Sequence, residues 1–383
     1  MSKQDKSNFQ KIVLLSFFAS FFGYNNLNQI LTAYIIKGKD LYSIYNSLSN
    51  KDFEDISRHL SAHFIRERLF DLGVKGLSTW SRLHPSYIID ASIFKMWLTE
   101  PDNEFYNKFF SGQTKRTQYG YKINLGGIAI AGTFYPMIIK VTSKKDTDAE
   151  VAQTILKEMH QITQDMENEY NLTFGQWYLS VDSGYSDIDL LNYADKELKI
   201  IPICVPVKNH LFEINNVKTN LRQYIEEHYI PREQKYYMEN GSDAEPFTIR
   251  IRAFYKSKNS WVTLLIFRLS GSKKVSVIYT TNLDIKAKTL RRNWFQRTHI
   301  EQFFRFCKHT LEFAASTYKN LDGFLRKLRL FFLKALFCNV VRNEFRKLKG
   351  MKSITFGNIR SHVTTYRIGE DWLINLINMQ EPF

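Results

Sequence analysis

The amino-acid sequence predicts an α/β fold, in which a central domain of strands and helices carries a β-rich insertion and is flanked by helical segments. Apolar runs of strand length alternate with amphipathic helical patterns in the middle of the chain, whereas helical periodicity dominates both ends. The chain has 383 residues, of which 44% are hydrophobic and 15% aromatic. This length exceeds one ordinary domain, and this composition favours a folded protein over a disordered one.

Residues 1–84 are predicted to form a helical N-terminal domain, because segments such as DFEDISRHLSAHFIRERLFDLGV repeat apolar residues at helical spacing. The apolar run 12–24 is shorter than the roughly 20 residues that span a bilayer, and no signal-peptide cleavage site follows it. A second apolar run, 331–341, is interrupted by Lys334. Both runs are therefore interpreted as buried helices, and no membrane association is expected.

Residues 85–210 contain the patterns of three strands, a helix, a strand, a second helix and a fifth strand. The strands are SYIIDASIF, YGYKINLGGIAIAG, TFYPMIIKVTSK, WYLSVD and IIPICVPVK. The order βββαβαβ is that of a ribonuclease-H-like fold, in which the first and fourth strands are neighbours at the centre of the sheet. The acids at the helix starts are assigned to capping and not to metal binding: Asp146, Asp148, Glu150, Asp187 and Asp189.

Residues 211–283 are predicted to be a β-rich insertion. FTIRIRAFYK, WVTLLIFRLS and KKVSVIYTTN alternate apolar and polar residues and are separated by turn-forming residues, while 217–239 are expected to be helical or irregular. Residues 284–350 resume the central domain with helices, and 351–383 form a C-terminal segment. The density of basic residues in FLRKLRLFFLKALFCNVVRNEFRKLKG favours contact with backbone phosphates over a merely solvated face.

Asp90 and Asp182 are the first two candidate site residues. Each is predicted to end a buried strand, in SYIIDASIF and WYLSVDSGY, and is followed by small or turn-forming residues. Such an aspartate is exposed at the rim of the sheet, where open α/β sheets place their sites. The alternative is a purely structural role as a turn former or helix N-cap.

A helix predicted within RRNWFQRTHIEQFFRFCKHTLE supplies the other candidates. Trp294, Arg297, Glu301 and Lys308 fall within about a 60° arc of the helical surface, and Arg305 joins that face. An adjacent apolar stripe would pack on a core. A lone acid is thus held beside several cations, which suits a carboxylate that acts on a phosphate. The alternative is an amphipathic helix with a solvated Arg297–Glu301 ion pair.

This spacing resembles the DDE transposases of bacterial insertion sequences, and within them the IS-four group. The signature of that group is Tyr, two residues, Arg, three residues, Glu, six residues and Lys. Here its positions are occupied, with Trp in place of Tyr, by Trp294, Arg297, Glu301 and Lys308. The sequence DSGY that begins at Asp182 similarly resembles the Asp-Arg-Gly-Tyr/Phe motif of the group, with Ser in place of Arg. The resemblance covers roughly residues 85–345.

The resemblance implies that Asp90, Asp182 and Glu301 are catalytic and hold two Mg²⁺ ions, for which Mn²⁺ can substitute. Asp90 would bridge both ions, and the other two acids would each hold one. Contacts with DNA are implied for the remaining candidates: Trp294, Arg297, Arg305 and Lys308. The implied activity is cut-and-paste transposition, in which a homodimer pairs the terminal inverted repeats of its element, cleaves the DNA and transfers the freed strand to target DNA.

The formal net charge of +15 indicates a polyanionic partner, either nucleic acid or an anionic membrane. The three cysteines (Cys204, Cys307 and Cys338) form no CxxC motif, so neither a zinc site nor a disulfide framework is indicated. A reducing cytoplasm is expected, and the resemblance adds a prokaryotic, nucleoid-associated location. Two other functions stay open: a ribonuclease-H-like nuclease that cuts without strand transfer, and a transposase-derived DNA-binding protein without catalysis. The presence of all three acids counts against the latter.

Overall fold

The computed structural model describes residues 84–95, 104–111, 116–130, 132–169, 173–207, 209–229, 246–272, 274–310 and 321–332, together with positions 55, 61, 62, 65 and 335. The chain divides into two compact units. We call Arg68–Phe94 together with Pro101–Glu301 the sheet unit, and the remainder the second unit. Apart from a few positions, the predicted helical domain 1–84 lies outside the described residues, as does the C-terminal segment 351–383.

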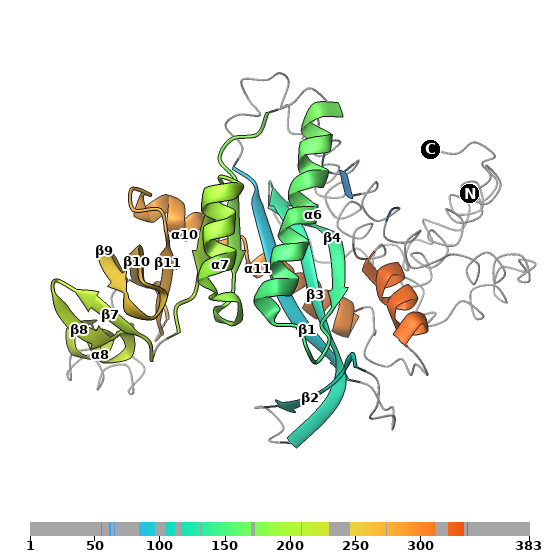
Figure 1. Cartoon of the computed structure of the whole chain (residues 1–383), viewed down its shortest axis with the longest axis horizontal. Coiled ribbons are helices and arrows are strands. Elements are labelled where there is room, and N and C mark those ends of the chain that lie inside the picture. Colours follow the sequence, from blue (N-terminus) through green and yellow to red (C-terminus); the bar gives the residue numbers. More distant parts are fainter. Residues whose placement is uncertain are drawn as a thin grey trace, which may run out of the picture. The chain divides into compact units, whose positions relative to one another are not determined.

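The described strands form one mixed sheet in the order β2–β3–β1–β5–β6–β11–β10–β9–β7–β8, with β4 paired to β3 (Figure 1). Its first six strands are β1 (Ser86–Lys95), β2 (Tyr106–Ser111), β3 (Arg116–Ile130), β4 (Thr133–Val141), β5 (Tyr178–Val181) and β6 (Ile201–Cys204). Strand β5 pairs in parallel with β1 on one side and β6 on the other, whereas β3 and β4 are antiparallel. The predicted adjacency of the two aspartate-bearing strands is therefore confirmed.

Strand β2 was not predicted. It pairs in antiparallel register with the first half of β3, from Tyr106 opposite Tyr121 to Ser111 opposite Arg116. The Tyr106 ring stacks on Tyr119 with centroids 5.9 Å apart. This strand depends on pairing with a long partner and on cross-strand aromatic contacts, and its own short sequence carries little alternation.

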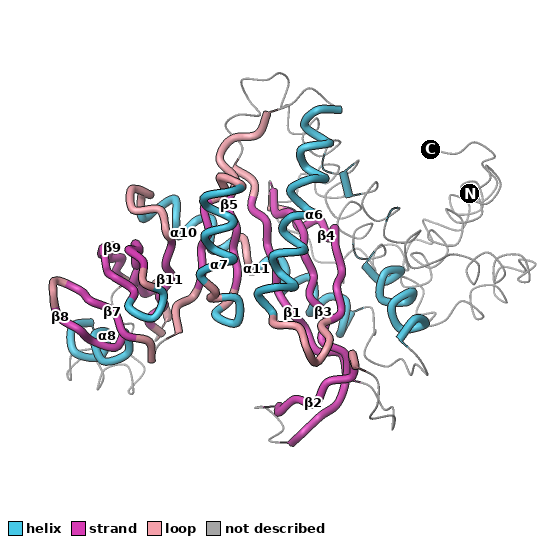
Figure 2. Tube along the Cα trace, in the orientation of Figure 1, coloured by secondary structure: helices cyan, strands magenta, loops and turns pink. Residues whose placement is uncertain are grey.

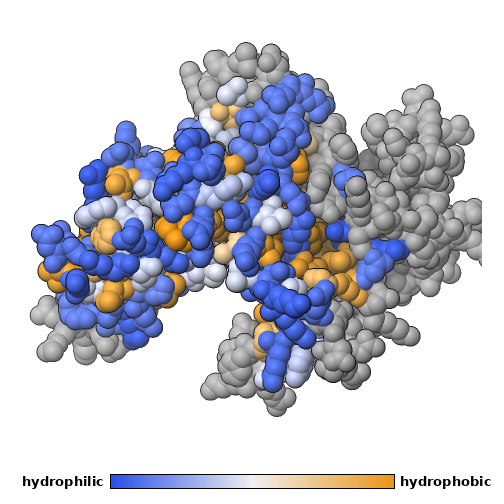
Figure 3. Space-filling model, viewed as in Figure 1, coloured by the Kyte–Doolittle hydropathy of each residue, from blue (hydrophilic) through white to orange (hydrophobic). Residues whose placement is uncertain are grey.

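Helix α6 (Asp148–Glu169) follows β4, as predicted, and buries an apolar stripe at helical spacing that includes Ile155 and Met159. Figures 1 and 2 show α6 and α7 (Ile188–Asn192) over the face of the sheet that is turned to the viewer. The close approach of α6 to β3 requires Gly126, because a Cβ there would lie 2.2 Å from Cγ2 of Ile155. The outward faces of both helices carry mainly hydrophilic residues (Figure 3).

Two of the predicted helix caps are confirmed. Glu150 and Thr147 form a reciprocal capping box at the start of α6, with the Thr147 amide 2.9 Å from the Glu150 carboxylate. Asp187 accepts hydrogen bonds from the amides of Asp189 and Leu190 at the start of α7.

The segment predicted as a β-rich insertion continues the same sheet. Its elements are β7 (Leu211–Ile214), β8 (Val217–Asn220), α8 (Leu221–Tyr229), β9 (Phe247–Tyr255), β10 (Ser260–Arg268) and β11 (Val275–Thr280). The three alternating segments are antiparallel strands, as predicted, and β11 joins β6 through Tyr279 opposite Cys204. The expectation for 217–239 was partly wrong, because Val217–Asn220 pairs with β7 in a hairpin. Asn215 and Asn216, both with positive φ, form its turn.

The helix predicted to carry Trp294 through Lys308 is interrupted. Helix α10 (Ala287–Phe295) ends in a turn, α11 (Thr298–Arg305) starts after it, and Phe306–Thr310 forms a π-helical turn. The Thr298 hydroxyl donates to the Phe295 carbonyl at 2.7 Å, and the amide of Arg297 bonds to the Trp294 carbonyl at i−3. A threonine that bonds the preceding turn competes with the regular helical ladder and accounts for the break.

A buried cluster fixes α10 on the sheet. Leu290 packs with residues from β5, β6, β10 and β11, including Tyr178, Ile203 and Leu265, and Trp294 lies against the same cluster. The apolar stripe predicted beside the candidate face is buried where the structure describes it, at Ile300, Phe303, Phe304 and Cys307. In the second unit Phe303 packs edge-on against Phe332, with ring centroids 5.1 Å apart.

Candidate active site

The register between β1 and β5 brings Asp90 and Asp182 together. The last paired residues are Ile89 and Val181, and each aspartate comes immediately after its member of that pair. The prediction that Asp90 ends its strand was wrong, because β1 continues to Lys95. Only the pairing of β1 with β5 stops before Asp90, so both carboxylates still occupy the same end of the parallel pair.

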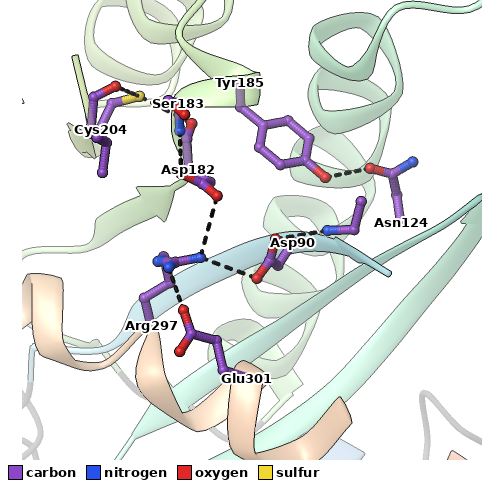
Figure 4. Close-up of polar contacts among 10 residues, drawn as sticks. Asp90, Asn124, Asp182, Ser183, Tyr185, Cys204, Arg297 and Glu301 are labelled. Carbon is purple, nitrogen blue, oxygen red and sulfur yellow. Dashed lines mark hydrogen bonds and ion pairs between the residues drawn. The ribbon is translucent and has the colours of Figure 1, made fainter. Parts of the chain in front are cut away.

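Each aspartate uses one carboxylate oxygen locally. Oδ1 of Asp90 accepts a hydrogen bond from the Ala91 amide at 2.9 Å. Oδ1 of Asp182 accepts from the Ser183 amide, which caps the 3₁₀ turn Ser183–Tyr185. The capping alternative is thus correct for Asp182, but it accounts for one oxygen only. The second oxygen of each aspartate faces the same neighbour, Arg297 (Figure 4).

Arg297 lies among three carboxylates. Its Nη1 is 3.1 Å from Oδ2 of Asp90 and 4.0 Å from Oδ2 of Asp182, while Nη2 donates to Oε1 of Glu301 (Figure 4). The side chains of Arg297 and Asp90 are each 15% exposed, whereas those of Asp182 and Glu301 are 46% and 45% exposed. One guanidinium at the edge of the core therefore joins acids from β1, the end of β5 and α11. The Arg297–Glu301 pair belongs to this network and is not merely a solvated helical pair.

The guanidinium of Arg297 is also 5.1 Å from the centre of the Trp294 ring. A cation at this distance is attracted by the ring electrons. Because Trp294 packs on the buried cluster below α10, it supports the guanidinium from the side of the core. Direct stacking of Trp294 on a base stays a prediction.

Burial makes Asp90 a weaker acid than an ordinary aspartate. It raises the pKa of Asp90 from 3.8 to about 6, with smaller contributions in the same direction from Asp182 and Glu301. Arg297 and the Ala91 amide lower that pKa but do not offset the burial. A perturbed carboxylic acid beside other acids is a common feature of functional sites.

A second polar cluster, which the sequence did not indicate, lies beside the aspartates (Figure 4). The buried Tyr185 hydroxyl donates to Oδ1 of Asn124, and Nδ2 of Asn124 donates to Thr142. Burial raises the pKa of Tyr185, and Asp90, Asp148 and Asp182 raise it further, so the hydroxyl stays protonated. The DSGY motif pointed to Tyr185, but nothing in the sequence indicated its partner on β3.

Lys122 and Asp148 form an ion pair beside this cluster. Asp148 was assigned to helix capping, and its pairing with a lysine 26 residues earlier could not be read from local sequence. Asp148 also contributes to the raised pKa of Tyr185, which places its charge near the site.

Arg305 and Lys308, the other two predicted DNA contacts, belong to the second unit. Arg305 is exposed near the end of α11, and Lys308 is half-buried in the following π-helical turn. The site within the sheet unit therefore consists of Asp90, Asp182, Glu301 and Arg297, with Trp294 beneath the guanidinium.

The three acids were expected to converge on a pair of metal ions. Among the described residues, no three His, Cys, Asp or Glu side chains gather around a common metal position, and the three acids instead converge on Arg297. The donor set nevertheless fits a hard divalent cation, since carboxylate oxygens are the ligands that Mg²⁺ and Mn²⁺ prefer. Arg297 carries one positive charge, so it neutralises only one of the three negative charges when all three acids are ionised.

A family model described as the transposase DDE domain matches residues 82–336. The chain belongs to the transposase DDE-domain family. The matched segment contains both aspartates, Arg297 and Glu301, so the network described above lies inside the family domain. Membership of this transposase family supports an enzyme that acts on DNA. No curated protein matches the chain. Among the described residues, no helix is long and apolar enough to cross a membrane.

Proposed function

We propose that this protein is the transposase of an insertion sequence of the IS-four type, with a ribonuclease-H-like catalytic domain. It binds the terminal inverted repeats of its element, cleaves DNA in a metal-dependent reaction and transfers the freed strand to target DNA. One observation carries the proposal: three carboxylates from two neighbouring parallel strands and α11 meet at one guanidinium inside the transposase DDE domain.

Asp90, Asp182 and Glu301 are the residues that would hold the divalent ions, either Mg²⁺ or Mn²⁺. When bound, a divalent cation supplies charge stabilisation at the reacting phosphate. The local hydrogen bonds from Ala91 and Ser183 hold the first two carboxylates in fixed orientations. Glu301 and Asp182 are nearly half exposed, so solvent ions and substrate can reach them.

Arg297 has a separate role in this proposal. Its positive charge holds the acids together in the metal-free protein, because like charges at this separation repel one another. Divalent ions bound by the acids would take over that neutralisation. The guanidinium is then available to a backbone phosphate, which its planar fork matches. Trp294 would contact the same DNA, with Arg305 and Lys308 as further phosphate contacts from the second unit.

The two proposed reaction steps consume only water and DNA. Water attacks the phosphorus at the element's end, the P–O3′ bond breaks, and the 3′ oxygen leaves as a hydroxyl after protonation. That hydroxyl then attacks a target phosphorus and displaces the target's 3′ oxygen. One phosphodiester bond forms as one breaks in this second step, whereas the first step consumes one water for the bond that it breaks. Two copies of the chain, each holding one end of the element, would carry out these steps on paired ends. End recognition is assigned to residues 1–84.

The test uses the full chain and a plasmid that carries the gene with its native flanking DNA. We expect Mg²⁺-dependent cleavage at the element's ends, followed by joining of those ends to a second plasmid. Asp90→Asn, Asp182→Asn and Glu301→Gln should each abolish cleavage but keep DNA binding. Asp189→Asn, which changes an exposed acid on α7, is the matched control and should cleave normally.

The possible results separate the candidate functions. Normal cleavage by any one of the three variants would remove that residue from the site. Cleavage at the ends without joined products would identify a nuclease and refute strand transfer. Binding without any cleavage by the unaltered chain, in either Mg²⁺ or Mn²⁺, would favour the DNA-binding derivative.

A further inference from the structure

A basic cleft lies in the sheet unit where α10 meets the end of β10. It has a volume of about 380 Å³, and four of the residues that line it are cationic: Arg268, Lys288, Arg291 and Arg292. Leu269 and Phe295 supply apolar surface, and none of the described residues that line the cleft is acidic. None of these residues belongs to the carboxylate network.

Helix α10 has two distinct faces. Arg291 and Arg292 lie three and four residues after Lys288, and Phe295 lies four and three residues after them, so all four share one face. Leu290 belongs to the buried cluster on the other side, and Trp294 and Phe295 pack against that cluster, so Phe295 lies at the border of the two faces. The helix is therefore held on the core by one face and presents its cations to the cleft with the other.

The surrounding sequence concentrates the positive charge of the chain. Between Pro246 and Gln296 there are 11 Lys and Arg residues and one acid, Asp284. That acid is paired with Arg252 at 2.9 Å, and it does not line the cleft. The excess of ten positive charges in this segment is two thirds of the formal net charge of +15. Such a field attracts a polyanion.

Two of the guanidinium groups are held in place by the protein. Nη1 of Arg291 donates to the Thr248 hydroxyl at 2.8 Å. The Arg268 guanidinium lies 4.9 Å from the centre of the Phe247 ring and donates to the Tyr229 carbonyl at 3.4 Å. A guanidinium has five N–H donors, so Arg291, anchored by one of them, keeps others for a phosphate. Arg268 is only 2% exposed, so it adds positive charge to the cleft and is not counted as a direct phosphate contact. Lys288 and Arg292 are exposed at the rim.

We propose that this cleft binds the sugar-phosphate backbone of DNA, at a site distinct from the carboxylates. The choice of DNA as the polyanion rests on the proposed function. The three cations of α10 that line the cleft extend over about one turn, roughly 6 Å at 1.5 Å per residue, which is longer than the site that a single phosphate would need. Backbone phosphates succeed one another at about 3.4 Å along the duplex axis on each strand. The cation spacing thus matches two successive phosphates, and the apolar surface of Phe295 and Leu269 suits the sugars beside them.

Helix α10 leads through Gln296 directly to Arg297. DNA held on α10 is thereby tied to the same short segment that carries the Arg297 contact with Asp90. The cleft would grip DNA that flanks the cleaved phosphate, without reading bases, since backbone contacts position a protein but carry no sequence information.

The test measures binding of the full chain to a fluorescent duplex over a range of KCl concentrations. Lys288→Gln/Arg292→Gln removes two exposed cations from the cleft. Lys157→Gln/Lys196→Gln removes two exposed cations elsewhere in the same unit, from α6 and the turn after α7, and is the control. Each lost phosphate contact lowers the slope of log K against log salt by about 0.9, so the cleft variant should lose about 1.8 and the control close to zero.

A second measurement needs no variant. DNA should protect Lys288 from acetylation in the unaltered chain, as read by mass spectrometry, and should leave Lys157 reactive. Inorganic phosphate at the same phosphate concentration should not give this protection; equal protection would indicate a site for single phosphates. Equal salt slopes for the two double variants, or unprotected Lys288 in the DNA complex, would overturn the proposal and leave the cleft to another partner, such as an acidic protein segment.

The salt slopes test the cleft, whereas cleavage of the element's ends tests the proposed function, so the two can fail separately. If the chain cleaves its element's ends but the two double variants have equal slopes, only the cleft assignment is wrong. If the slopes differ as expected but no cleavage occurs in either metal, the cleft binds DNA in a protein that is not an active transposase.

Discussion

Arg297 donates a hydrogen bond to Asp90 across 3.1 Å, although 207 residues separate the two in the sequence. Both side chains are largely buried, and the same guanidinium also contacts Glu301 and lies 4.0 Å from Asp182. The positive charge of Arg297 offsets the repulsion among these three acids. The contact joins an acid on β1 to the turn between α10 and α11, which the sequence places far from the central strands.

Replacing Arg297 tests its role as the internal counter-ion. Arg297→Ala leaves three acids facing one another, so the free energy of unfolding should fall by about 3 kcal/mol in metal-free buffer, as for other broken buried pairs. Mg²⁺ should restore more stability to this variant than it adds to the unaltered chain. Urea denaturation with and without Mg²⁺ provides the measurement.

The matched control is Arg222→Ala. Arg222 also pairs with an acid four residues later, Glu226, but both side chains are more than half exposed. Its loss should cost less than about 0.5 kcal/mol. Equal losses in the two variants would show that the Arg297 network is no more than a surface ion pair.

The raised pKa of Asp90 predicts a specific pH dependence of stability. Because the pKa in the folded chain, about 6, exceeds the ordinary 3.8, the folded state binds more protons than the unfolded state between these values. Stability therefore falls as pH rises through that window. The shift corresponds to up to about 3 kcal/mol at 1.36 kcal/mol per pH unit.

Asp90→Asn removes this titration. The difference in unfolding free energy between the unaltered chain and Asp90→Asn should thus decrease between about pH 4 and pH 6 and level off above about pH 7. Chemical denaturation at a series of pH values in metal-free buffer measures it. Two curves that stay parallel across this range would refute a raised Asp90 pKa.

Tyr185 should contribute to stability through its buried hydroxyl. Tyr185→Phe leaves the carbonyl oxygen of the Asn124 side chain without this donor, and an unsatisfied buried group costs about 1–3 kcal/mol. Tyr119→Phe is the control, since Tyr119 is 46% exposed and surface changes are usually within about 0.5 kcal/mol. Thermal unfolding of both variants compares them, and a Tyr185→Phe variant as stable as its control would exclude the predicted contribution.

Trp294 occupies the position at which the resembled IS-four signature has tyrosine, and two substitutions test what this difference does. Trp294→Tyr keeps an aromatic face for Arg297 and adds a hydroxyl that can bond phosphate, so cleavage should be unchanged or faster. Trp294→Ala removes the ring that lies 5.1 Å from the guanidinium and should lower stability by about 2–3 kcal/mol, since the side chain is only partly buried. Cleavage rates on a pre-nicked repeat substrate, with urea denaturation beside them, separate the two effects. Slower cleavage by Trp294→Tyr would show that the indole itself is required.

The sequence indicated the central architecture because its signals are local. Apolar strands around Asp90 and Asp182, the α6 periodicity and the capping residues Glu150 and Asp187 are all readable within short windows. These features position the two aspartates at one end of a parallel strand pair, so the predicted proximity of the two residues is confirmed.

The remaining features depend on long-range contacts. Strand β2 forms by pairing with the extended β3. The break between α10 and α11 depends on Thr298 bonding back to Phe295. The contacts of Arg297 with Asp90 and of Tyr185 with Asn124 join separate elements. The apolar periodicity of a helix or strand does not indicate such contacts.

We propose that Asp90 is a ligand of the catalytic metal, and the variant Asp90→Cys tests this claim. Mn²⁺ tolerates a sulfur ligand better than the harder Mg²⁺ does. We therefore predict that Asp90→Cys loses cleavage of the element's ends in Mg²⁺ and regains a substantial part of it in Mn²⁺, while Asp189→Cys behaves like the unaltered chain in both metals. Undiminished cleavage by Asp90→Cys in Mg²⁺, or the same ratio of Mn²⁺ to Mg²⁺ activity as the unaltered chain, would contradict the claim.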